Sequence, residues 1–511
     1  MNPSPPVNLD TIKKMADNKK FYNLLKTRFS TFPVLTFFVD YFIDYRAIAR
    51  IQKDHEEAKT KPSSSISHLL RERLPIVYNS ILNLFKKSIK HYDVLFVSRR
   101  RSAQVKMNER LITSDYLFWS IFEKMPDLEG KISKALITDD LMPSPKYDNV
   151  ITYSFADFLY PHDITRSLIK SFEIRIAWIR IEKEIVSEFS KLDLNNDIFT
   201  RFFSLKNLTL LCLLDISITN YTKMLAPKII IYNDDALFFK SNNKISLCVL
   251  QSARLSCEKE QCMQGFYDAF NLDERYYVDC SFVHGDNYRK FSRFRTRFGE
   301  VIVTGQPRYD IVYDANSVYS KESFRRRYNI KSDNKIILWA TQCQYSSIEE
   351  NTKSFEAVFG TMQKLKGTTL IVKQHPAEDE EYTKIMSEYI HNYGIDALIT
   401  PKNSDTLEQI FISDLMITRV STAAIEAVAM NKPVIVLNLS GEPDPVEYVK
   451  EGVAYGVYNR DNLEQAILAL LEEDSLSKSR EQYIKKYLYK IDGKATERVV
   501  DIIKDLIEIK D

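Results

Sequence analysis

The chain has 511 residues, 44% of them hydrophobic and 27% charged, and its 71 basic and 69 acidic side chains leave a formal net charge of +2. This length suggests about two to four domains, and the balanced charge excludes a strongly basic nucleic-acid-binding protein. Only 12 residues are glycine, and neither G-x-G-x-x-G nor G-x-x-x-x-G-K-[ST] occurs. The glycine-rich nucleotide loops are therefore excluded, and any phosphate must be held by helix ends and side chains.

The cysteines and the apolar runs predict a reduced, cytoplasmic protein. Six scattered cysteines are too few for a disulfide framework, and Cys257 and Cys262 lack the second ligand pair of a zinc site. The first residues show no charged region followed by an apolar core, so we expect no secretory signal. The longest strongly apolar run, Leu208–Ile218, contains Asp215 and is too short to span a membrane.

Residues 1–90 predict a helical extension. The run Phe37–Tyr45 is aromatic and amphipathic, and apolar residues recur with helical spacing within Leu69–Lys90. Such a helix either lies in a membrane interface or packs against the rest of the chain, and the second interpretation is favoured.

Residues 91–300 predict an α/β domain. Short apolar runs typical of buried parallel strands alternate with helical stretches such as Ile164–Leu192. The predicted strands are Asp93–Val97, Val150–Tyr153, Lys228–Tyr232, Ser246–Leu250 and Tyr277–Val283, and Val301–Thr304 follows across a boundary placed near Arg297–Glu300.

Residues 301–485 predict a second, more regular doubly wound domain, and residues 486–511 predict a terminal helix. The predicted strands are Lys335–Ala340, Thr369–Lys373, Ala397–Thr400, Asp414–Thr418 and Pro433–Leu437. The fold class is therefore α/β, with two Rossmann-like domains behind a helical extension. Ligands of such sheets bind beyond the carboxyl ends of the strands, so we expect a ligand in the cleft between the domains.

The strongest chemical signal follows the predicted strand Asp414–Thr418. Ser421 and Thr422 open a helix, and their hydroxyls together with the first backbone N–H groups predict an anion site. Glu426 lies one turn further, on a face that can look toward the same crevice. The alternative is an ordinary N-cap before a core helix.

A second signal is His375, which follows the predicted strand Thr369–Lys373 and precedes Pro376. Proline stops the strand and fixes the loop. An imidazole at this position can bind a phosphate or transfer a proton. The alternative is a core histidine whose hydrogen bonds are satisfied by the protein.

Two turns supply further candidates. Gly305 permits close backbone approach, and Arg308 can pair with a phosphate or clamp a hinge; the alternative is a purely structural hinge. Glu442 and Asp444 follow the strand Pro433–Leu437 in a rigid acidic segment that can bind sugar hydroxyls. The alternative there is a solvated turn.

Two features belong to the first half of the chain. Asp234 and Asp235 follow a predicted strand, and either one can deprotonate an acceptor hydroxyl, although paired carboxylates also occur in plain polar turns. Seven basic residues within 86–106 can attract a phosphorylated or lipid-linked acceptor or the inner face of a membrane. The favoured alternative for this basic run is a solvated face.

Four motifs in order resemble the GT-B glycosyltransferase superfamily, and within it the surface-polysaccharide branch. That branch contains CDP-glycerol glycerophosphotransferases and capsule and sialic-acid-polymer transferases, and it is related to UDP-N-acetylglucosamine 2-epimerases. The resemblance covers roughly residues 228–505. The motifs are Thr304–Asp310, Lys373–Pro376, Ser421–Glu426 with Asn431–Pro433, and Asp492–Arg498.

The resemblance implies that the second domain, residues 301–485, binds a nucleotide-activated donor and that the first domain, residues 91–300, lies on the acceptor side. His375, Ser421 and Thr422 would hold the donor phosphates, and Glu426 would hold the ribose hydroxyls. No cofactor or catalytic metal is expected, because helix dipole and side chains stabilise the leaving diphosphate.

The resemblance also implies that Gly305 and Arg308 lie at the interdomain cleft and that the terminal helix crosses back to the first domain. One departure concerns the catalytic base. Relatives often carry Gln-His-Gly after a first-domain strand, whereas this chain has Gln251, Ser252 and Ala253.

The leading hypothesis is a transferase that moves a sugar or a polyol phosphate from a nucleotide-linked donor to a surface-glycan or lipid-linked acceptor. One alternative is a non-hydrolysing UDP-N-acetylglucosamine 2-epimerase, against which the missing His-x-Glu-Ala-Gly motif counts. The other is a transferase-like binding protein without catalysis.

Overall fold

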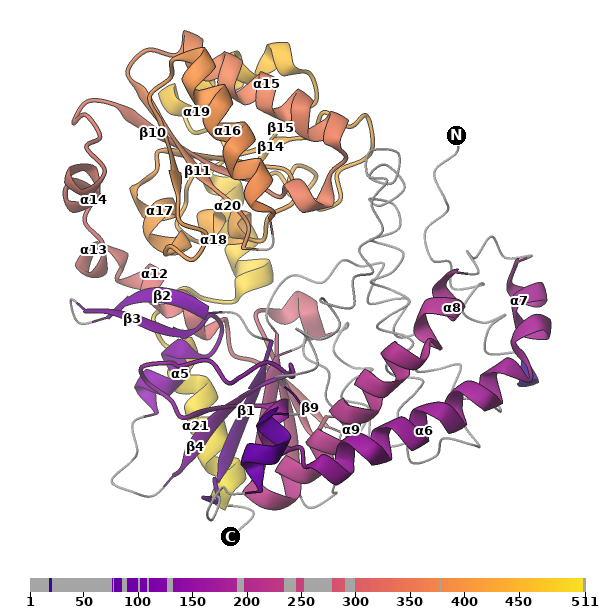
Figure 1. Ribbon diagram of the computed structural model, residues 1–511. Helices are drawn as coiled ribbons and strands as arrows, with labels where there is room; N and C mark the ends of the chain where they lie inside the picture. The colour runs from indigo at the N-terminus through magenta and orange to yellow at the C-terminus, as the bar shows by residue number, and fades with distance from the viewer. Residues whose placement is uncertain are drawn as a thin grey trace.

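The computed structural model consists of two α/β domains joined by short helices (Figure 1). The residues that it describes are 18–20, 76, 78–84, 90–99, 102–107, 110–125, 132–190, 197–233, 245–251, 278–289, 299–376 and 378–508. Most of the predicted extension 1–90 therefore lies outside the described residues.

The first sheet has seven parallel strands in the order β5-β4-β1-β6-β7-β8-β9. Counted along the chain, its first six strands follow the Rossmann order 3-2-1-4-5-6, and a seventh is added at one edge. Val, Ile, Leu and Phe fill the central strands, which are fully buried because helices cover both faces. The strands are β1 (Val94–Ser98), β4 (Lys134–Thr138), β5 (Thr152–Ser154), β6 (Ile229–Asn233), β7 (Ser246–Leu250), β8 (Cys280–Val283) and β9 (Glu300–Val303).

The second sheet has six parallel strands in the order β12-β11-β10-β13-β14-β15, which is again 3-2-1-4-5-6. The predicted fold class, two Rossmann-like doubly wound domains, is confirmed for the described part of the chain. The strands are β10 (Lys335–Ala340), β11 (Thr368–Lys373), β12 (Ala397–Thr400), β13 (Leu415–Thr418), β14 (Val434–Leu437) and β15 (Tyr455–Val457).

Helices cover the second sheet on both faces because successive side chains of a strand point to opposite sides. In β10, Ile337 and Trp339 pack under α15 (Ile348–Lys364), α16 (Glu380–Tyr393) and α19 (Leu463–Glu472). Ile336 and Leu338 pack on the other face, under α17 (Thr406–Ile412) and α18 (Ala423–Ala429). The second domain thus has two cores, one on each face of the sheet.

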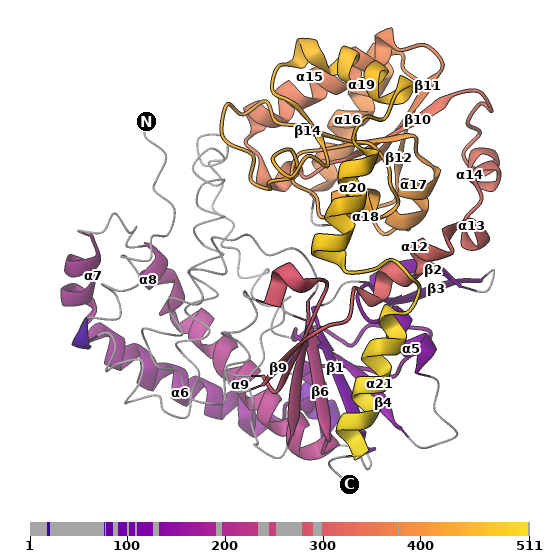
Figure 2. The same cartoon turned by 180° about the vertical axis from the view of Figure 1, so that it is seen from behind.

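The first sheet is covered in the same way. One face carries α6 (Pro161–Ile179) and α9 (Leu205–Leu225), a long helix pair that extends away from the sheet toward α7 (Glu182–Ser190) and α8 (Asp197–Phe202) (Figure 1). The other face carries α5 (Trp119–Lys124) and α21 (Ala495–Glu508). Figure 2 shows α20 (Ser477–Tyr483) on the second domain and α21, after a bend in the chain, on the first.

The connection between the sheets corrects the predicted boundary at residue 300. β9 pairs with β8 and belongs to the first sheet, and its Ile302 packs on the core of that sheet. Val301 and Val303 pack instead on a cluster that contains residues of the second domain. The chain then runs through η4 (Pro307–Tyr309), α12 (Asp310–Tyr313), α13 (Ala315–Val318) and α14 (Lys321–Arg327). An antiparallel hairpin of the first domain, β2 (Ser102–Met107) and β3 (Arg110–Asp115), packs against this connection.

Candidate functional site

The second sheet reverses its strand order between β10 and β13, which are neighbours in space. In an open α/β sheet a ligand binds in the crevice beyond the carboxyl ends of the strands at such a switch point. The segments that border it are residues 341–347 after β10 and residues 419–422 after β13. The Ser421 motif therefore lies where a ligand is expected.

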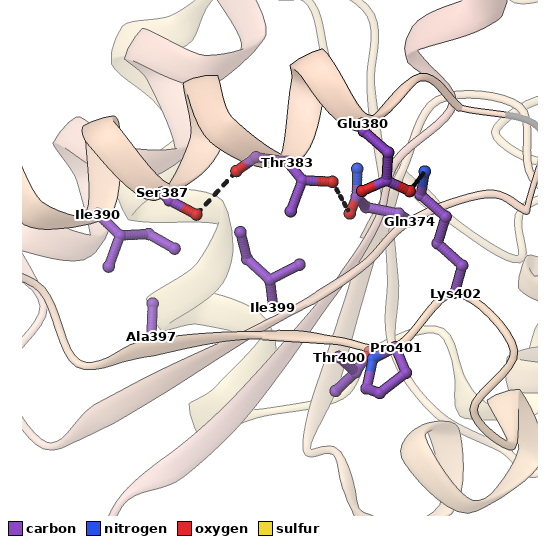
Figure 3. Close-up of a pocket in the computed structure, with 10 residues that line it drawn as sticks. All are labelled: Gln374, Glu380, Thr383, Ser387, Ile390, Ala397, Ile399, Thr400, Pro401 and Lys402. Atoms are coloured by element: carbon purple, nitrogen blue, oxygen red, sulfur yellow. Dashed lines mark hydrogen bonds and ion pairs between the residues drawn. The ribbon is translucent and has the colours of Figure 1, made fainter.

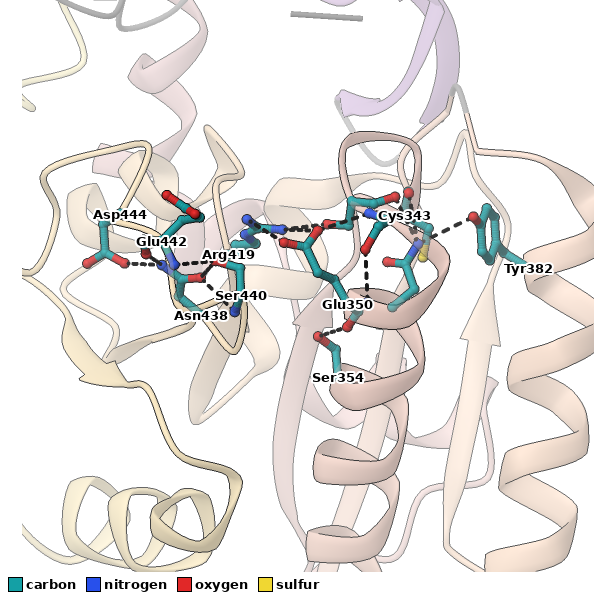
Figure 4. Close-up of polar contacts among 12 residues, drawn as sticks. Cys343, Glu350, Ser354, Tyr382, Arg419, Asn438, Ser440, Glu442 and Asp444 are labelled. Carbon is teal, nitrogen blue, oxygen red and sulfur yellow. Dashed lines mark hydrogen bonds and ion pairs between the residues drawn. The ribbon is translucent and has the colours of Figure 1, made fainter. Parts of the chain in front are cut away.

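Arg419 spans this switch point, and the sequence analysis did not identify it. Its Nη1 donates to Ser346 Oγ at 2.8 Å and to Glu350 Oε2 at 3.1 Å (Figure 4). Glu350 also completes the capping box of α15 with Ser347. Arg419 Nε is buried and has no hydrogen-bond partner among the described residues. The only sequence signal for this cation was its place directly after a buried strand.

A buried carboxylate joins the loops that follow β10 and β11. Glu378 accepts hydrogen bonds from Thr341 Oγ1 at 3.1 Å, from the backbone N–H of Cys343 at 3.0 Å and from Gln374 Nε2 at 3.2 Å. Three donors satisfy a charge that would otherwise be costly to bury. Glu378 therefore fixes the relative position of the two loops.

His375 follows β11 as predicted, and it is half-buried. Its carbonyl accepts a hydrogen bond from the backbone N–H of Glu378 at 3.0 Å. The neighbouring Lys373 donates from Nζ to the carbonyls of Gln374 and Lys402, and burial lowers the pKa of this lysine to about 8. The role of His375 in phosphate binding or proton transfer stays a prediction.

Ser421 and Thr422 precede α18, which begins at Ala423 rather than at Ser421. Ser421 Oγ accepts from the backbone N–H of Ala423 at 3.2 Å, and Thr418 Oγ1 accepts from the backbone N–H of Ser421 at 3.3 Å. The Thr422 side chain makes no capping hydrogen bond and is exposed. Both residues border the switch point, and their phosphate-binding role stays a prediction.

Glu426 and Arg308 contact each other, which the sequence analysis did not foresee. Arg308 Nη2 lies 2.6 Å from Glu426 Oε1, and their side chains are only 4% and 1% exposed. Tyr116 of the first domain donates to the same oxygen at 3.0 Å. In this conformation Glu426 does not face an open crevice, because its side chain is enclosed where the domains meet.

Gly305 forms the hinge after β9, with φ of +76°. The hinge is held by the start of α21: Asp310 accepts from the backbone N–H groups of Ala495 at 2.8 Å and Thr496 at 2.7 Å. Arg498 Nε donates to the carbonyl of Thr304 at 2.8 Å. Two of the predicted motifs, at residues 304–310 and 492–498, are therefore one structural unit.

The sequence analysis also did not identify a buried histidine of the first domain. His284 follows β8, and its Nε2 lies 2.9 Å from the carbonyl of Gln251 and 2.7 Å from Nε2 of Gln306. Burial, partly opposed by the contact with Gln251, lowers the pKa of His284 to about 4. The imidazole is therefore neutral near pH 7 and fixes the carboxyl ends of β7, β8 and β9.

In the acidic segment after β14, one of the two predicted carboxylates accepts hydrogen bonds from the protein itself. Asp444 accepts from Asn438 Nδ2 at 2.9 Å (Figure 4). It also accepts from the Tyr458 hydroxyl at 2.7 Å. The side chain of Glu442 is exposed, and its carbonyl accepts from Asn438 at 2.9 Å. Of the two predicted sugar-binding carboxylates, Glu442 is therefore the one whose side chain is open to a ligand.

Several predicted residues lie outside the described residues. They include Asp234 and Asp235, the candidate bases, and four of the seven basic residues in the run 86–106, namely Lys86, Lys87, Arg100 and Arg101. Of the others, Lys90 is exposed, and Arg99 Nε lies 3.9 Å from Asp139. Within the described ranges no three His, Cys, Asp or Glu side chains are grouped to hold a metal ion.

A groove of about 660 Å³ lies between α16 and β12, at the outer edge of the second sheet (Figure 3). The polar side chains at one end of the groove bond to one another: Lys402 Nζ donates to Glu380 Oε1 at 2.8 Å, and Thr383 donates to Gln374 at 2.8 Å.

In the described part of the chain, no helix is long and apolar enough to cross a membrane.

Residues 269–505 match the family described as CDP-glycerol:poly(glycerophosphate) glycerophosphotransferase. The predicted resemblance to this branch is confirmed over that region, which contains all four motifs. The teichoic acid poly(ribitol-phosphate) polymerase of Bacillus spizizenii is 26% identical over 236 residues. These residues are 43% of this chain and only 36% of that relative.

Two solved structures show an overall likeness at low identity. The wall teichoic acid polymerase TagF is 10% identical with a TM-score of 0.47, over 88% of this chain and 100% of that chain. The UDP-GlcNAc 2-epimerase from Neisseria meningitidis, bound to UDP-GlcNAc, is 13% identical with a TM-score of 0.45, over 81% of this chain and 99% of that chain.

Proposed function

We propose that the protein is a transferase that moves a polyol phosphate or a sugar from a nucleotide-activated donor, with a CDP-linked polyol as the favoured donor class. The acceptor is a hydroxyl group of a surface glycan or a lipid-linked glycan. One observation supports this most strongly. The region matched to the glycerophosphotransferase family brings His375, Ser421 and Thr422 to the carboxyl edge of one sheet, beside the half-buried cation Arg419.

The donor phosphates would bind at the switch point between β10 and β13. Arg419 is held there by Ser346 and Glu350 but keeps its Nε unused. A guanidinium binds phosphate oxygens strongly and would stabilise the negative charge of the departing nucleotide. The hydroxyls of Ser421 and Thr422 and the imidazole of His375 would supply further hydrogen bonds to the same oxygens.

The reaction would be a displacement at phosphorus or at the anomeric carbon. For a CDP-linked polyol, the acceptor oxygen forms a bond to the polyol-bearing phosphorus, and the bond from that phosphorus to the nucleoside monophosphate breaks. The acceptor proton goes to a general base. Asp234 and Asp235 remain the proposed bases, and the absence of a required metal ion or other cofactor remains part of the proposal.

A nucleotide screen tests the donor site. We expect CDP, UDP, CMP or GDP to raise the melting temperature, because a ligand that binds only the folded state stabilises it. Arg419→Gln should weaken binding about tenfold or more, since it removes a charged phosphate contact. Arg460→Gln is the matched control, because Arg460 is 63% exposed and pairs only at the surface.

Two results would contradict the proposal. One is the absence of any nucleotide-dependent shift together with unchanged surface glycans in a host that carries His375→Ala. The other is nucleotide binding without turnover for every donor and acceptor tried, which would favour a binding protein. Conversion of UDP-N-acetylglucosamine without any acceptor, followed by NMR, would instead support the epimerase alternative.

We further propose that the protein contacts an anionic membrane surface, where a lipid-linked acceptor would be found. The support is α6, whose large apolar residues face solvent: Ile169, Phe172, Ile176 and Ile179 are 58%, 51%, 51% and 54% exposed. Their spacing forms one stripe along the helix.

The opposite face of α6 is the buried one, and it is formed by Ile174, Ala177 and Trp178 together with small polar residues. Ser167 and Ser171 are buried, and the Ser171 hydroxyl lies 3.0 Å from that of Thr209 on α9. Arg166 and Arg180 are exposed near the two ends of the stripe. An exposed apolar stripe with cationic ends suits the surface of an anionic bilayer.

Vesicle flotation tests this contact. We expect binding to phosphatidylglycerol vesicles to exceed binding to phosphatidylcholine vesicles, and Phe172→Ser with Ile176→Ser to reduce it severalfold. Leu111→Ser is the control, because Leu111 is 61% exposed on the separate hairpin. Equal flotation of the stripe variant and the control variant would refute the assignment of this surface.

A further inference from the structure

Tyr116 is a first-domain residue that reaches into the second domain. It follows β3, where Asp115 Oδ1 accepts from the backbone N–H groups of Leu117 and Phe118, both at 2.9 Å. These hydrogen bonds fix the turn between β3 and α5 and so fix the direction in which Tyr116 leaves the domain. Its hydroxyl donates to Oε1 of Glu426, 310 residues away in the chain, at 3.0 Å.

Arg308 completes a cluster with Tyr116 and Glu426, here called the Glu426 cluster. Arg308 belongs to η4, directly after the Gly305 hinge, and its guanidinium carbon lies 3.6 Å from the centre of the Tyr116 ring. Its Nη2 lies 2.6 Å from Glu426 Oε1. The cluster therefore joins the first domain, the hinge and the second domain at one carboxylate oxygen.

Two other polar atoms of the Glu426 cluster lack partners among the described residues. Both donors use Oε1, whereas Glu426 Oε2 and Arg308 Nε are buried and make no hydrogen bond to any described residue. A buried ion pair with unsatisfied atoms contributes little net stability, because both charges have lost their water. The arrangement is therefore one that a ligand with suitable hydroxyl groups can replace at low cost.

We infer that Tyr116 is a positioning residue that keeps Glu426 closed in the donor-free protein, so that donor hydroxyl groups must displace the Tyr116 hydroxyl to reach this carboxylate. The inference rests on the proposed donor site. Displacement breaks the one hydrogen bond from the first domain to Glu426 in the cluster, so donor binding and the relative position of the domains are coupled. Arg308 moves with the hinge and remains the charge partner of Glu426.

Tyr116→Phe tests the inference, because it keeps the ring under Arg308 and removes only the competing hydroxyl. We expect the variant to bind the nucleotide identified by the screen about fivefold more tightly, since one competing hydrogen bond is lost. Tyr319→Phe is the matched control, because the Tyr319 hydroxyl also donates to a carboxylate near the domain junction, that of Asp405 at 2.7 Å. The nucleotide affinity of Tyr319→Phe should stay at the wild-type value.

If Tyr116 had only a structural role, Tyr116→Phe would not raise the affinity for the nucleotide. Unchanged or weaker nucleotide binding by Tyr116→Phe, at wild-type levels of folded protein, would overturn the inference. Failure of every variant and of the wild type to bind nucleotide would overturn the proposed donor site instead. Hydrogen exchange of the backbone amides in residues 423–429 then tests the Glu426 cluster. Faster exchange in Tyr116→Phe than in Tyr319→Phe would support the role of Tyr116 in keeping Glu426 closed. Equal exchange in the two variants would overturn it.

Discussion

The carboxyl edges of the two sheets differ in chemistry although the sheets share one strand order. The first edge is held by neutral groups, His284, Gln251 and Gln306, whose polar atoms lie within hydrogen-bond distance of one another. The second is held by charged groups, with Glu378 joining two loops and Arg419 crossing the switch point. The strand order determines where a ligand binds, and the side chains at the edge determine what kind of ligand that is.

The Glu426 cluster connects the two edges, and breaking it should have the largest effect. Arg308→Met leaves the buried carboxylate of Glu426 without its cation, which we expect to cost about 3–5 kcal/mol of unfolding free energy. Arg327→Met should cost less than about 1 kcal/mol, because the Arg327 side chain is 49% exposed in its pair with Glu408. Urea denaturation measures both. Equal losses would mean that the Glu426 cluster does not link the domains energetically.

The neutrality of the first edge predicts a specific response to acid. The pKa of His284 is lowered to about 4, mainly by burial, whereas an unfolded histidine titrates near 6.5. Above pH 6.5 both states are neutral. As the pH falls from 6.5 to 4, only the unfolded state gains the proton, so stability falls by about 3 kcal/mol.

The His284→Gln variant removes this contribution, so its stability should change less than that of the wild type between pH 7 and pH 4. Denaturation at several pH values measures the difference in slope. His162→Gln is the matched control for the loss of a histidine, because the His162 side chain is 75% exposed. A wild-type slope in His284→Gln would show that the first edge does not depend on a neutral imidazole.

The second edge predicts a smaller loss when its charge is neutralised. Glu378→Gln places an amide NH2 where a carboxylate oxygen accepted a hydrogen bond, and we expect a cost of about 1–3 kcal/mol. Glu464→Gln, which changes a half-exposed partner of Lys364, should stay within about 0.5 kcal/mol of the wild type. Equal stabilities of the two variants would mean that Glu378 is not what joins the loops after β10 and β11.

The strands that the sequence predicts are those with long apolar runs. β10 and β11 contain consecutive Ile, Leu and Val residues, and the periodicity indicates them directly. β4 was missed because its apolar run is only Ala-Leu-Ile between polar residues, and β15 because it is three residues long and contains Gly456. Both pair with strands already in the sheet, so tertiary contacts rather than local propensity determine them.

The candidate site was predictable only where a motif adjoins its own strand. His375 and Ser421 follow β11 and β13 in sequence, so their place at the edge could be inferred from the chain alone. The contact of Glu426 with Tyr116 joins residues 310 positions apart, and no local pattern encodes it. His284 was missed for a related reason, because its partners come from two other strand ends.

The hinge offers the finest test of how the two domains are joined. Gly305 and Gly441 have nearly the same positive φ, +76° and +78°, so alanine should strain both by about 1–2 kcal/mol. A Cβ at Gly305 would also lie 3.2 Å from that of Ala495 in α21, whereas one at Gly441 would meet nothing within 4 Å. Gly305→Ala should therefore cost about 1 kcal/mol more than Gly441→Ala in urea denaturation, because α21 must shift away from the hinge. Equal losses of unfolding free energy in the two variants would mean that α21 can shift at this point without cost. Asp310 and Arg498 would then not fix α21 against the hinge.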